Sequence, residues 1–205
     1  MKSPKVFGIG FHKTGTTSLA RALDILGYTV TGMNGVENRN IAARAIDIAN
    51  KVSAKFDAFQ DNPWPMVYRE MDERYPGSKF ILTVRETDRW IKGVVKHFGR
   101  TYEPMREWIY GTGCGYPLGN EAVYIERYDR HNREVLEYFG ARPNDLLTMR
   151  ITEGEGWETL CAFLECEVPA EAFPNENNAG VRRTPSFVAG AVVRVVSDPP
   201  ELLDE

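Results

Sequence analysis

The chain has few cysteines and no cysteine motif. Its 205 residues include three, Cys114, Cys161 and Cys166, an odd number without the spacing of a metal site. This usage is typical of reduced thiols, so we expect a reducing compartment and a cytoplasmic protein. Cys161 lies in an apolar segment and is expected in the core.

Long hydrophobic runs and a strong excess of one charge are also missing. Gly8 interrupts the N-terminal apolar run, and Arg194 ends the run over 187–193, so neither predicts a signal peptide or a membrane-inserted segment. The net charge of −4 argues against nucleic acid as a partner. With 42% apolar and 26% charged residues, the chain should form a globular domain with a full-size core.

Apolar runs and helical periodicities alternate over the first hundred residues. The runs typical of buried strands cover 6–9, 28–31, 56–59 and 79–84. Helical spacing covers 16–26, 41–52, 66–74 and 88–98. This alternation predicts an α/β fold, a three-layer α/β/α domain around a central, mostly parallel sheet.

The second half is less regular. Residues 102–118 are rich in glycine and aromatic residues, and we expect an irregular segment, either a substrate gate or a surface excursion. A long helix is predicted over 121–139, a strand over 145–150 and a helix over 156–163. We divide the chain into a domain, 1–175, and a tail, 176–205, that packs on the domain or on a partner chain, as in a homodimer.

The segment after the first strand has the layout of a phosphate-binding loop. Gly10 and Gly15 have the spacing of a nucleotide triphosphatase loop, but Thr16 stands where such a loop has its lysine, and Lys13 lies inside the loop. Backbone N–H groups and the helix start favour an anion there. The alternative is an ordinary glycine turn with a hydroxyl cap.

Residues 11–19 resemble the 5′-phosphosulfate loop of sulfotransferases. Similar stretches lie at 57–63 and 75–86, with a weaker one at 155–164, so the resemblance covers most of residues 5–175 and is closest to short, single-domain, bacterial-type members. It implies a fold like that of P-loop nucleoside triphosphatases and 3′-phosphoadenosine 5′-phosphosulfate as co-substrate. The residues it assigns to this nucleotide are Lys13, Thr14, Gly15, Thr16, Thr17, Ser18, Arg85 and Arg182.

Sulfuryl transfer is an in-line displacement that depends mainly on positioning and electrostatics. Lys13 is expected to stabilise charge on the oxygen that bridges phosphate and sulfate. A sulfuryl group carries less negative charge than a phosphoryl group, so we expect that no metal is required.

An acceptor hydroxyl or amine must lose a proton as it attacks. By resemblance, the segment that holds Asp61 supplies the base, and the alternative is that Asp61 caps a helix beginning near Pro65. His12 is the second candidate base. His97 and His131 lie on expected helices and are interpreted as surface or packing residues.

Arg85 follows the strand over 79–84, where the resemblance implies a 3′-phosphate contact. The related enzymes usually add a serine about eight residues further on, and this chain has Gly93 there. The alternative for Arg85 is an ion pair with Glu86 or Asp88. A basic loop over 178–183, with Arg182, is a further candidate contact.

The acceptor is expected to be a small molecule, a glycan or a lipid. Several aromatic residues are candidates for its pocket, and Trp64 is favoured because it lies beside Asp61. The candidates are Trp64, Trp90, Trp108, Tyr110 and Tyr116. Two alternative functions stay open: a P-loop kinase or nucleotide hydrolase with an atypical loop, and a non-catalytic nucleotide-binding relative.

Overall fold

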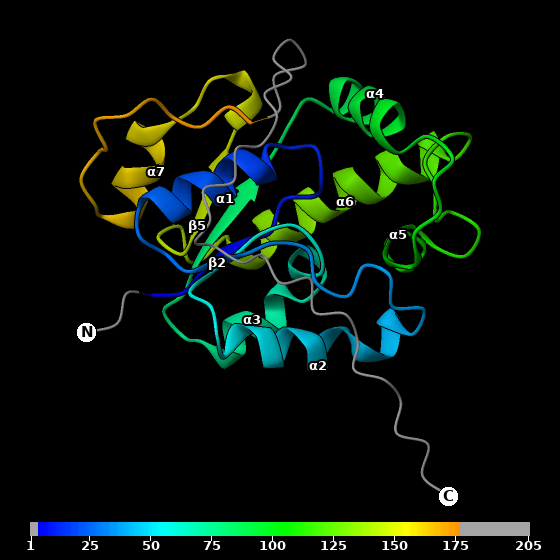
Figure 1. Ribbon diagram of the computed structural model, residues 1–205, viewed down its shortest axis with the longest axis horizontal. Coiled ribbons are helices and arrows are strands. Elements are labelled where there is room, and N and C mark those ends of the chain that lie inside the picture. The colour runs from blue at the N-terminus through cyan, green and yellow to red at the C-terminus, as the bar shows by residue number, and fades with distance from the viewer. Residues whose placement is uncertain (1–3, 177–205) are drawn as a thin grey trace, which may run out of the picture.

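A five-stranded parallel sheet forms the centre of the molecule in the computed structural model, which describes residues 4–176 (Figure 1). The strand order is β2-β3-β1-β4-β5, and every neighbouring pair is parallel. The strands are β1 (Val6–Gly8), β2 (Val30–Thr31), β3 (Ala58–Phe59), β4 (Lys79–Thr83) and β5 (Leu146–Met149). The predicted parallel α/β architecture is confirmed.

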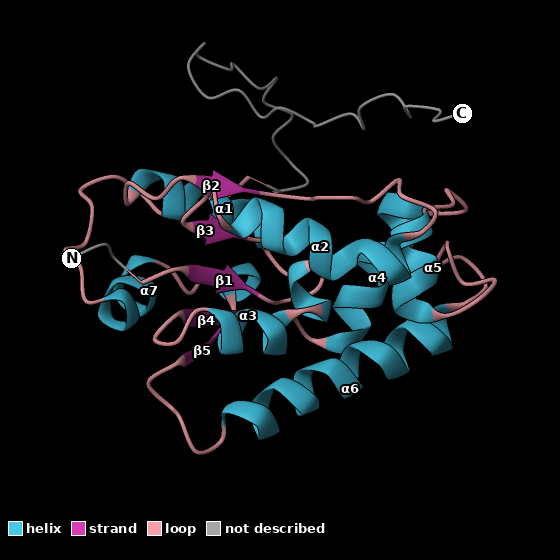
Figure 2. Ribbon diagram, turned by 90° about the horizontal axis from the view of Figure 1, so that it is seen from below, coloured by secondary structure: helices cyan, strands magenta, loops and turns pink. Residues whose placement is uncertain are grey.

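Helices cover both faces of this sheet and its carboxyl edge (Figure 2). One face packs against α1 (Thr16–Ile25) and α7 (Trp157–Leu164). The other packs against α2 (Ile41–Ser53), α3 (Tyr68–Arg74) and α6 (Glu121–Phe139). Two further helices, α4 (Thr87–Phe98) and α5 (Pro104–Tyr110), lie beyond the strand ends (Figure 1).

The alternation of side chains along β1 separates the two cores. Phe7 is in register with Phe59 on one side and Phe80 on the other. The three rings stack, with centroids 4.5 Å and 5.3 Å from Phe7. Val6 points to the opposite face and packs in the cluster that contains Leu23 of α1. The three inner strands β1, β3 and β4 are therefore buried on both sides, apart from Lys79 at the start of β4, whereas the edge strands β2 and β5 are partly exposed.

One expectation about the local structure is wrong. Residues 102–118 are not irregular throughout, because α5 forms inside them, beginning at Pro104 in the first turn. The helix expected over 66–74 is confirmed as α3, which begins two residues later, and a separate 3-10 turn, Trp64–Met66, precedes it. Pro63 and Pro65 lie before and within that 3-10 turn, and a prolyl residue has no N–H to donate.

The long helix α6 has the predicted bounds, and one side of it is buried. His131 on that side lies with Nε2 2.7 Å from the carbonyl oxygen of Ile9 and stacks on Phe11 at 4.3 Å. It is fully buried, and burial lowers the pKa of its imidazole to about 3. His131 is thus a packing residue that stays neutral in the fold.

Acid should destabilise the protein through His131. Below pH 6.5 the unfolded chain binds a proton that the folded imidazole does not bind, so stability is lost as the pH falls. Between pH 7 and pH 5 this group should remove about 2 kcal/mol from the free energy of unfolding. His131→Gln retains an N–H donor for the carbonyl of Ile9. In urea unfolding, the free energy of unfolding of this variant should therefore fall by about 2 kcal/mol less than that of the wild type between pH 7 and pH 5. An equal loss in both proteins would contradict the assignment.

Candidate functional site

The sheet order brings three predicted segments to one edge. Strands β3, β1 and β4 are neighbours, so the residues that follow them, Asp61, the loop over 9–15 and Arg85, lie together. A direct contact joins Asp61 to the start of α1, immediately after the loop: Thr16 Oγ1 donates to Asp61 Oδ2 over 3.3 Å. The structure thus brings together the segments that were expected to converge.

The loop is held against the end of β4. A Cβ atom at Gly10 would overlap Thr83, so only glycine allows this approach. Thr14 Oγ1 donates to the carbonyl of Phe11 at 2.5 Å and lies 2.6 Å from Thr83 Oγ1. Because Thr14 is fully buried and its hydroxyl group is occupied in this way, its side chain is not available to a ligand.

Lys13 lies at the turn of the loop, in the left-handed region at φ 66°. A side chain is uncommon in this conformation, and it is maintained here by the packing around the loop. Burial and the charge of Arg85 lower the pKa of Lys13, and Asp61 opposes that shift. Within residues 4–176 no carboxylate lies within 4.0 Å of its ammonium. The charge is therefore available to an anion.

Asp61 keeps its carboxyl group at the loop. Oδ1 accepts the N–H of Asn62 at 2.8 Å, and Oδ2 accepts from Thr16. Burial raises the pKa of Asp61, while these hydrogen bonds and Lys13 act in the opposite direction. Neither the 3-10 turn nor α3 receives a side-chain cap from it, so the structure does not support the alternative role as a helix cap. A raised pKa suits a general base.

His12 is buried inside the loop and tied to two helices. Its Nε2 lies 3.1 Å from Tyr110 Oη of α5, and its carbonyl oxygen accepts Trp90 Nε1–H of α4 at 2.9 Å. Burial lowers the pKa of His12 to about 3, and Arg106 and Lys13 add to the shift. So weak a base accepts a proton poorly at neutral pH, and this geometry favours a positioning role for His12.

Arg85 is held by its backbone and has a free guanidinium. Tyr128 Oη accepts the N–H of Arg85 at 2.9 Å and donates to its carbonyl at 2.8 Å. The expected alternative partner Glu86 instead caps α4, accepting two backbone N–H groups. Among residues 4–176 Arg85 has no ion pair. A Cβ atom at Gly93 would lie 3.2 Å from its Nη1, so the glycine leaves room for this side chain.

Some of the other predicted site residues are buried and do not face the site. Trp64 is fully buried, with its ring 4.5 Å from that of Phe59 and 5.8 Å from that of Phe7. The expectation that Trp64 lines an acceptor pocket is therefore replaced by a place in the core, because no part of its side chain is exposed. Thr17 is exposed at the start of α1, whereas Ser18 is buried and accepts the N–H of Glu176 at 3.2 Å.

Arg182 and the rest of the loop over 178–183 lie outside the described residues. Within residues 4–176, no three His, Cys, Asp or Glu side chains gather closely enough to hold a metal ion. The same part of the chain contains no helix with the length and apolarity needed to cross a membrane.

Two residues that hold the site were not foreseen in that role. Tyr110 and Tyr128 fix His12 and Arg85 through their hydroxyl groups. Tyr128 lies on the buried side of α6 with Tyr124 and His131, at helical spacing. That spacing is visible in the sequence, but it indicates only burial and not the partner of each hydroxyl group.

Comparison with known proteins agrees with this geometry. The sulfotransferase domain family matches residues 5–116 and 93–181, which together cover most of the chain. The chain belongs to this family. It is also 24% identical over 150 residues to the "Ava biosynthesis cluster protein M" of Aspergillus versicolor, covering 62% of this chain and 56% of that relative. The chain therefore spans little more than half the length of the curated relative it matches.

Proposed function

We propose that this sulfotransferase-family chain moves a sulfuryl group from 3′-phosphoadenosine 5′-phosphosulfate to a hydroxyl or amine acceptor. The observation that carries the proposal is the pairing of chemistries at the start of α1. The ammonium of Lys13 has no carboxylate partner within the described residues, although the charge of Asp61 acts on it, and the Asp61 carboxyl group accepts from Thr16 at the start of α1. Sulfuryl transfer needs a cation for the anionic donor, which Lys13 supplies, and a base for the attacking hydroxyl group, which Asp61 supplies.

In the proposed reaction, the loop backbone and the start of α1 bind the 5′-phosphosulfate. The acceptor oxygen or nitrogen forms a bond to sulfur while the bond from sulfur to the phosphate oxygen breaks. Lys13 stabilises the charge that develops on that leaving oxygen. Asp61 takes the proton from the acceptor. The products are the sulfated acceptor and adenosine 3′,5′-bisphosphate, and no metal is needed.

Arg85 is proposed to bind the 3′-phosphate of the donor, because its guanidinium has no internal ion pair at the end of β4. Arg182, in the tail over 176–205, is proposed as a second contact on the resemblance alone. The proposed catalytic domain is thus 1–175, with the tail contributing to donor binding.

Lys13→Met should lower the rate of sulfate transfer by about 10²–10³-fold, since it removes the charge at the leaving oxygen. The melting temperature should change little, because the ammonium has no internal partner. Lys92→Met, at an exposed position of α4, is the matched control. Both can be assayed with radiolabelled donor and a panel of phenols, sugars and amines. Turnover of Lys13→Met near that of the wild type would exclude Lys13 from the mechanism.

Asp61→Asn should retain donor binding and lose about 10²–10⁴-fold in kcat. Asparagine tolerates the φ of 63° at this position and keeps an oxygen for the Asn62 N–H. Because burial raises the pKa of Asp61, the acid limb of the wild-type kcat profile should lie above pH 3.8. The residual activity of the variant should lack that limb. An unchanged kcat would place the base elsewhere.

Thermal melting distinguishes the alternative functions. Adenosine 3′,5′-bisphosphate should raise the melting temperature without Mg²⁺. Stabilisation by ATP that requires Mg²⁺ would instead support a kinase or hydrolase. Binding of the bisphosphate without transfer to any acceptor in a broad panel would support a non-catalytic relative.

Gly93→Ser should tighten bisphosphate binding by roughly fivefold, the gain expected from one added hydrogen bond. The new hydroxyl group would lie beside Arg85, whose flexible end can shift to admit it. Gly93→Ala adds the same Cβ atom without a hydroxyl group and should not tighten binding. Calorimetric titration of both variants measures the difference. Equal affinities would contradict a 3′-phosphate site at Arg85.

A further inference from the structure

The turn that ends α7 brings two cysteines together. Glu165 takes the left-handed conformation there, at φ 56° and ψ 43°, and Cys166 follows it. The N–H groups of both residues donate to the carbonyl oxygen of Cys161, and the hydrogen bond from Cys166 is 3.1 Å long. In a helix end of this kind, the side chains of the first and last residues of the turn commonly pack on each other, and here both are cysteines.

The backbone hydrogen bond limits the distance between the two cysteines. A carbonyl oxygen lies about 2.4 Å from its own Cα atom, and an amide nitrogen lies about 1.5 Å from its own. With 3.1 Å between oxygen and nitrogen, the Cα atoms of Cys161 and Cys166 are at most about 7 Å apart. Cα atoms joined by a disulfide usually lie about 4.4–6.8 Å apart. The turn therefore holds the pair within the reach of a disulfide.

The two thiols differ in exposure. Cys161 is buried in the core cluster between the sheet and α1, whereas Cys166 is exposed. Burial, a hydrogen bond with the Cys166 thiol and the charges of Cys166 and Glu158 raise the pKa of Cys161 to about 11. A reagent in solution therefore meets the thiol of Cys166 first, and the thiol of Cys161 reacts with its neighbour in the turn.

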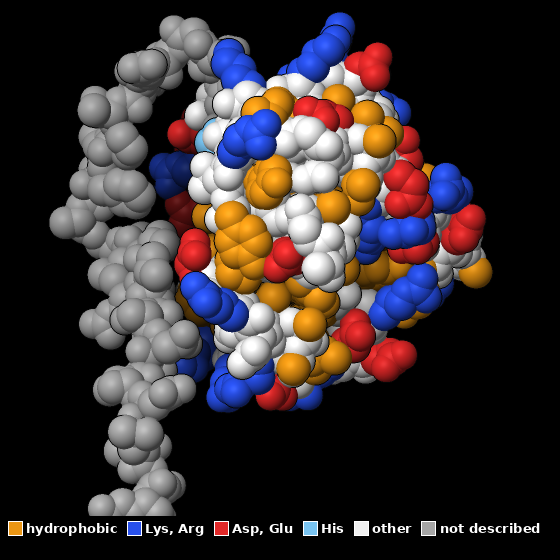
Figure 3. Space-filling view, turned by 90° about the vertical axis from the view of Figure 1, so that its right-hand side faces the viewer, with side chains coloured by type: hydrophobic (Ala, Val, Ile, Leu, Met, Phe, Trp, Pro, Cys, Tyr) orange, Lys and Arg blue, Asp and Glu red, His pale blue; other side chains and the backbone are white. Residues whose placement is uncertain are grey.

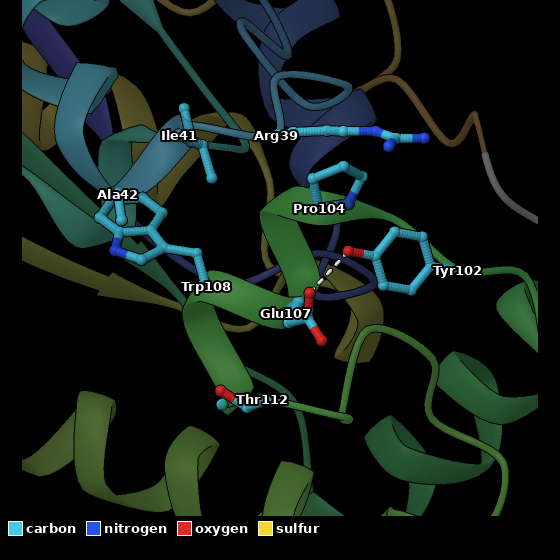
Figure 4. A pocket seen from close by; sticks show the side chains of 9 residues that line it. Arg39, Ile41, Ala42, Tyr102, Pro104, Glu107, Trp108 and Thr112 are labelled. Carbon is cyan, nitrogen blue, oxygen red and sulfur yellow. Dashed lines mark hydrogen bonds between the residues drawn. The ribbon is translucent and has the colours of Figure 1, made fainter.

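The third cysteine is remote from this pair. Cys114 follows α5, and α5 and α7 lie on opposite sides of the molecule (Figure 1). Its carbonyl oxygen accepts the hydroxyl group of Tyr124 on α6 at 2.9 Å. Gly111 and Thr112, close to it in the chain, line an open pocket between α5 and the start of α2 (Figure 4). Figure 3 shows the side that carries α5, where apolar and charged side chains are mixed. Cys114 therefore cannot reach the other two thiols within one chain.

We infer that Cys161 and Cys166 form a modification site, a dithiol that a small-molecule disulfide oxidises reversibly to an internal disulfide. The Cys166 thiolate attacks one sulfur of the reagent and releases the other half, which leaves a mixed disulfide on Cys166. The Cys161 thiolate then attacks the Cys166 sulfur and releases the second half. Two protein thiols become one disulfide, the reagent becomes two thiols, and these thiols take up the two protons. The inference does not depend on the proposed sulfuryl transfer.

The internal disulfide closes the turn from which the chain returns to the start of α1. After Cys166 the chain runs back along α7, where the carbonyl oxygen of Glu171 accepts Trp157 Nε1–H at 2.7 Å. Further on, the N–H of Glu176 donates to Ser18 Oγ at 3.2 Å, directly after the phosphate loop. Because the reduced turn already holds the two cysteines together, the bond restrains the unfolded chain with little strain in the folded one. Oxidation should therefore stabilise the protein.

The probe is cystamine, a cationic disulfide, because Glu165 and Glu167 flank Cys166. Mass spectrometry of the full chain and of its peptides identifies each product. The free thiols of the wild type, counted in denaturant, should fall from three to one, the one at Cys114, and dithiothreitol should restore all three. Cys161→Ala should stop at a mixed disulfide on Cys166. Cys166→Ala should keep a free thiol at Cys161 over the same time. Cys114→Ala is the matched control and should form the internal disulfide as the wild type does.

A mixed disulfide that persists on Cys166 of the wild type overturns the inference, and so does a disulfide that includes Cys114 or joins two chains. Urea unfolding then tests the fit of the bond to the turn. The midpoint should be higher for the oxidised than for the reduced wild type, with the same shift in Cys114→Ala and none in Cys166→Ala. A lower midpoint after oxidation also overturns the inference, because it would mean that the turn must distort to form the bond.

Discussion

The contact between the phosphate loop and the end of β4 determines the rest of the site. Gly10 passes Thr83 where no side chain fits, and the buried Thr14 hydroxyl group joins the loop to the same strand. These contacts force the tight turn in which Lys13 takes a left-handed conformation. The charges of both Arg85 and Asp61 act on its ammonium there. A side chain at position 10 would overlap Thr83 and push the loop, and Lys13 with it, away from the end of β4.

Aromatic side chains and not ion pairs hold this arrangement from the outside. Trp90 and Tyr110 bond to His12, and Tyr128 bonds to the backbone of Arg85. This leaves the cations of Lys13 and Arg85 without a carboxylate partner among the described residues, and burial together with the charge of Arg85 lowers the pKa of Lys13. The repulsion between these two cations destabilises the folded state, and the packing of the aromatic core offsets it. Such a site favours an anion that carries more than one negative charge.

The local sequence pattern was sufficient to predict the sheet, but it was insufficient to predict which side chains surround the site. The apolar run ending at Thr83, the glycine frame of the loop and the periodicity of α6 each follow from neighbouring residues, and the convergence of Asp61 with the loop follows from the geometry of parallel sheets. Helix α5 was missed because it is only seven residues long and is anchored by a buried arginine, Arg106, which in a sequence resembles a surface residue. Trp64 was misplaced because sequence proximity to Asp61 does not determine on which side of the chain a ring packs.

The same contrast separates the sheet from the helix that supports the loop. The three residues proposed for the reaction, Lys13, Asp61 and Arg85, follow strand ends of one sheet, so the proposed site is built on elements that tolerate little movement. Helix α5 supports the loop from outside the sheet, because Tyr110 on its buried side lies 3.1 Å from His12. A substitution on α5 that removes this contact therefore disturbs the loop that bears Lys13.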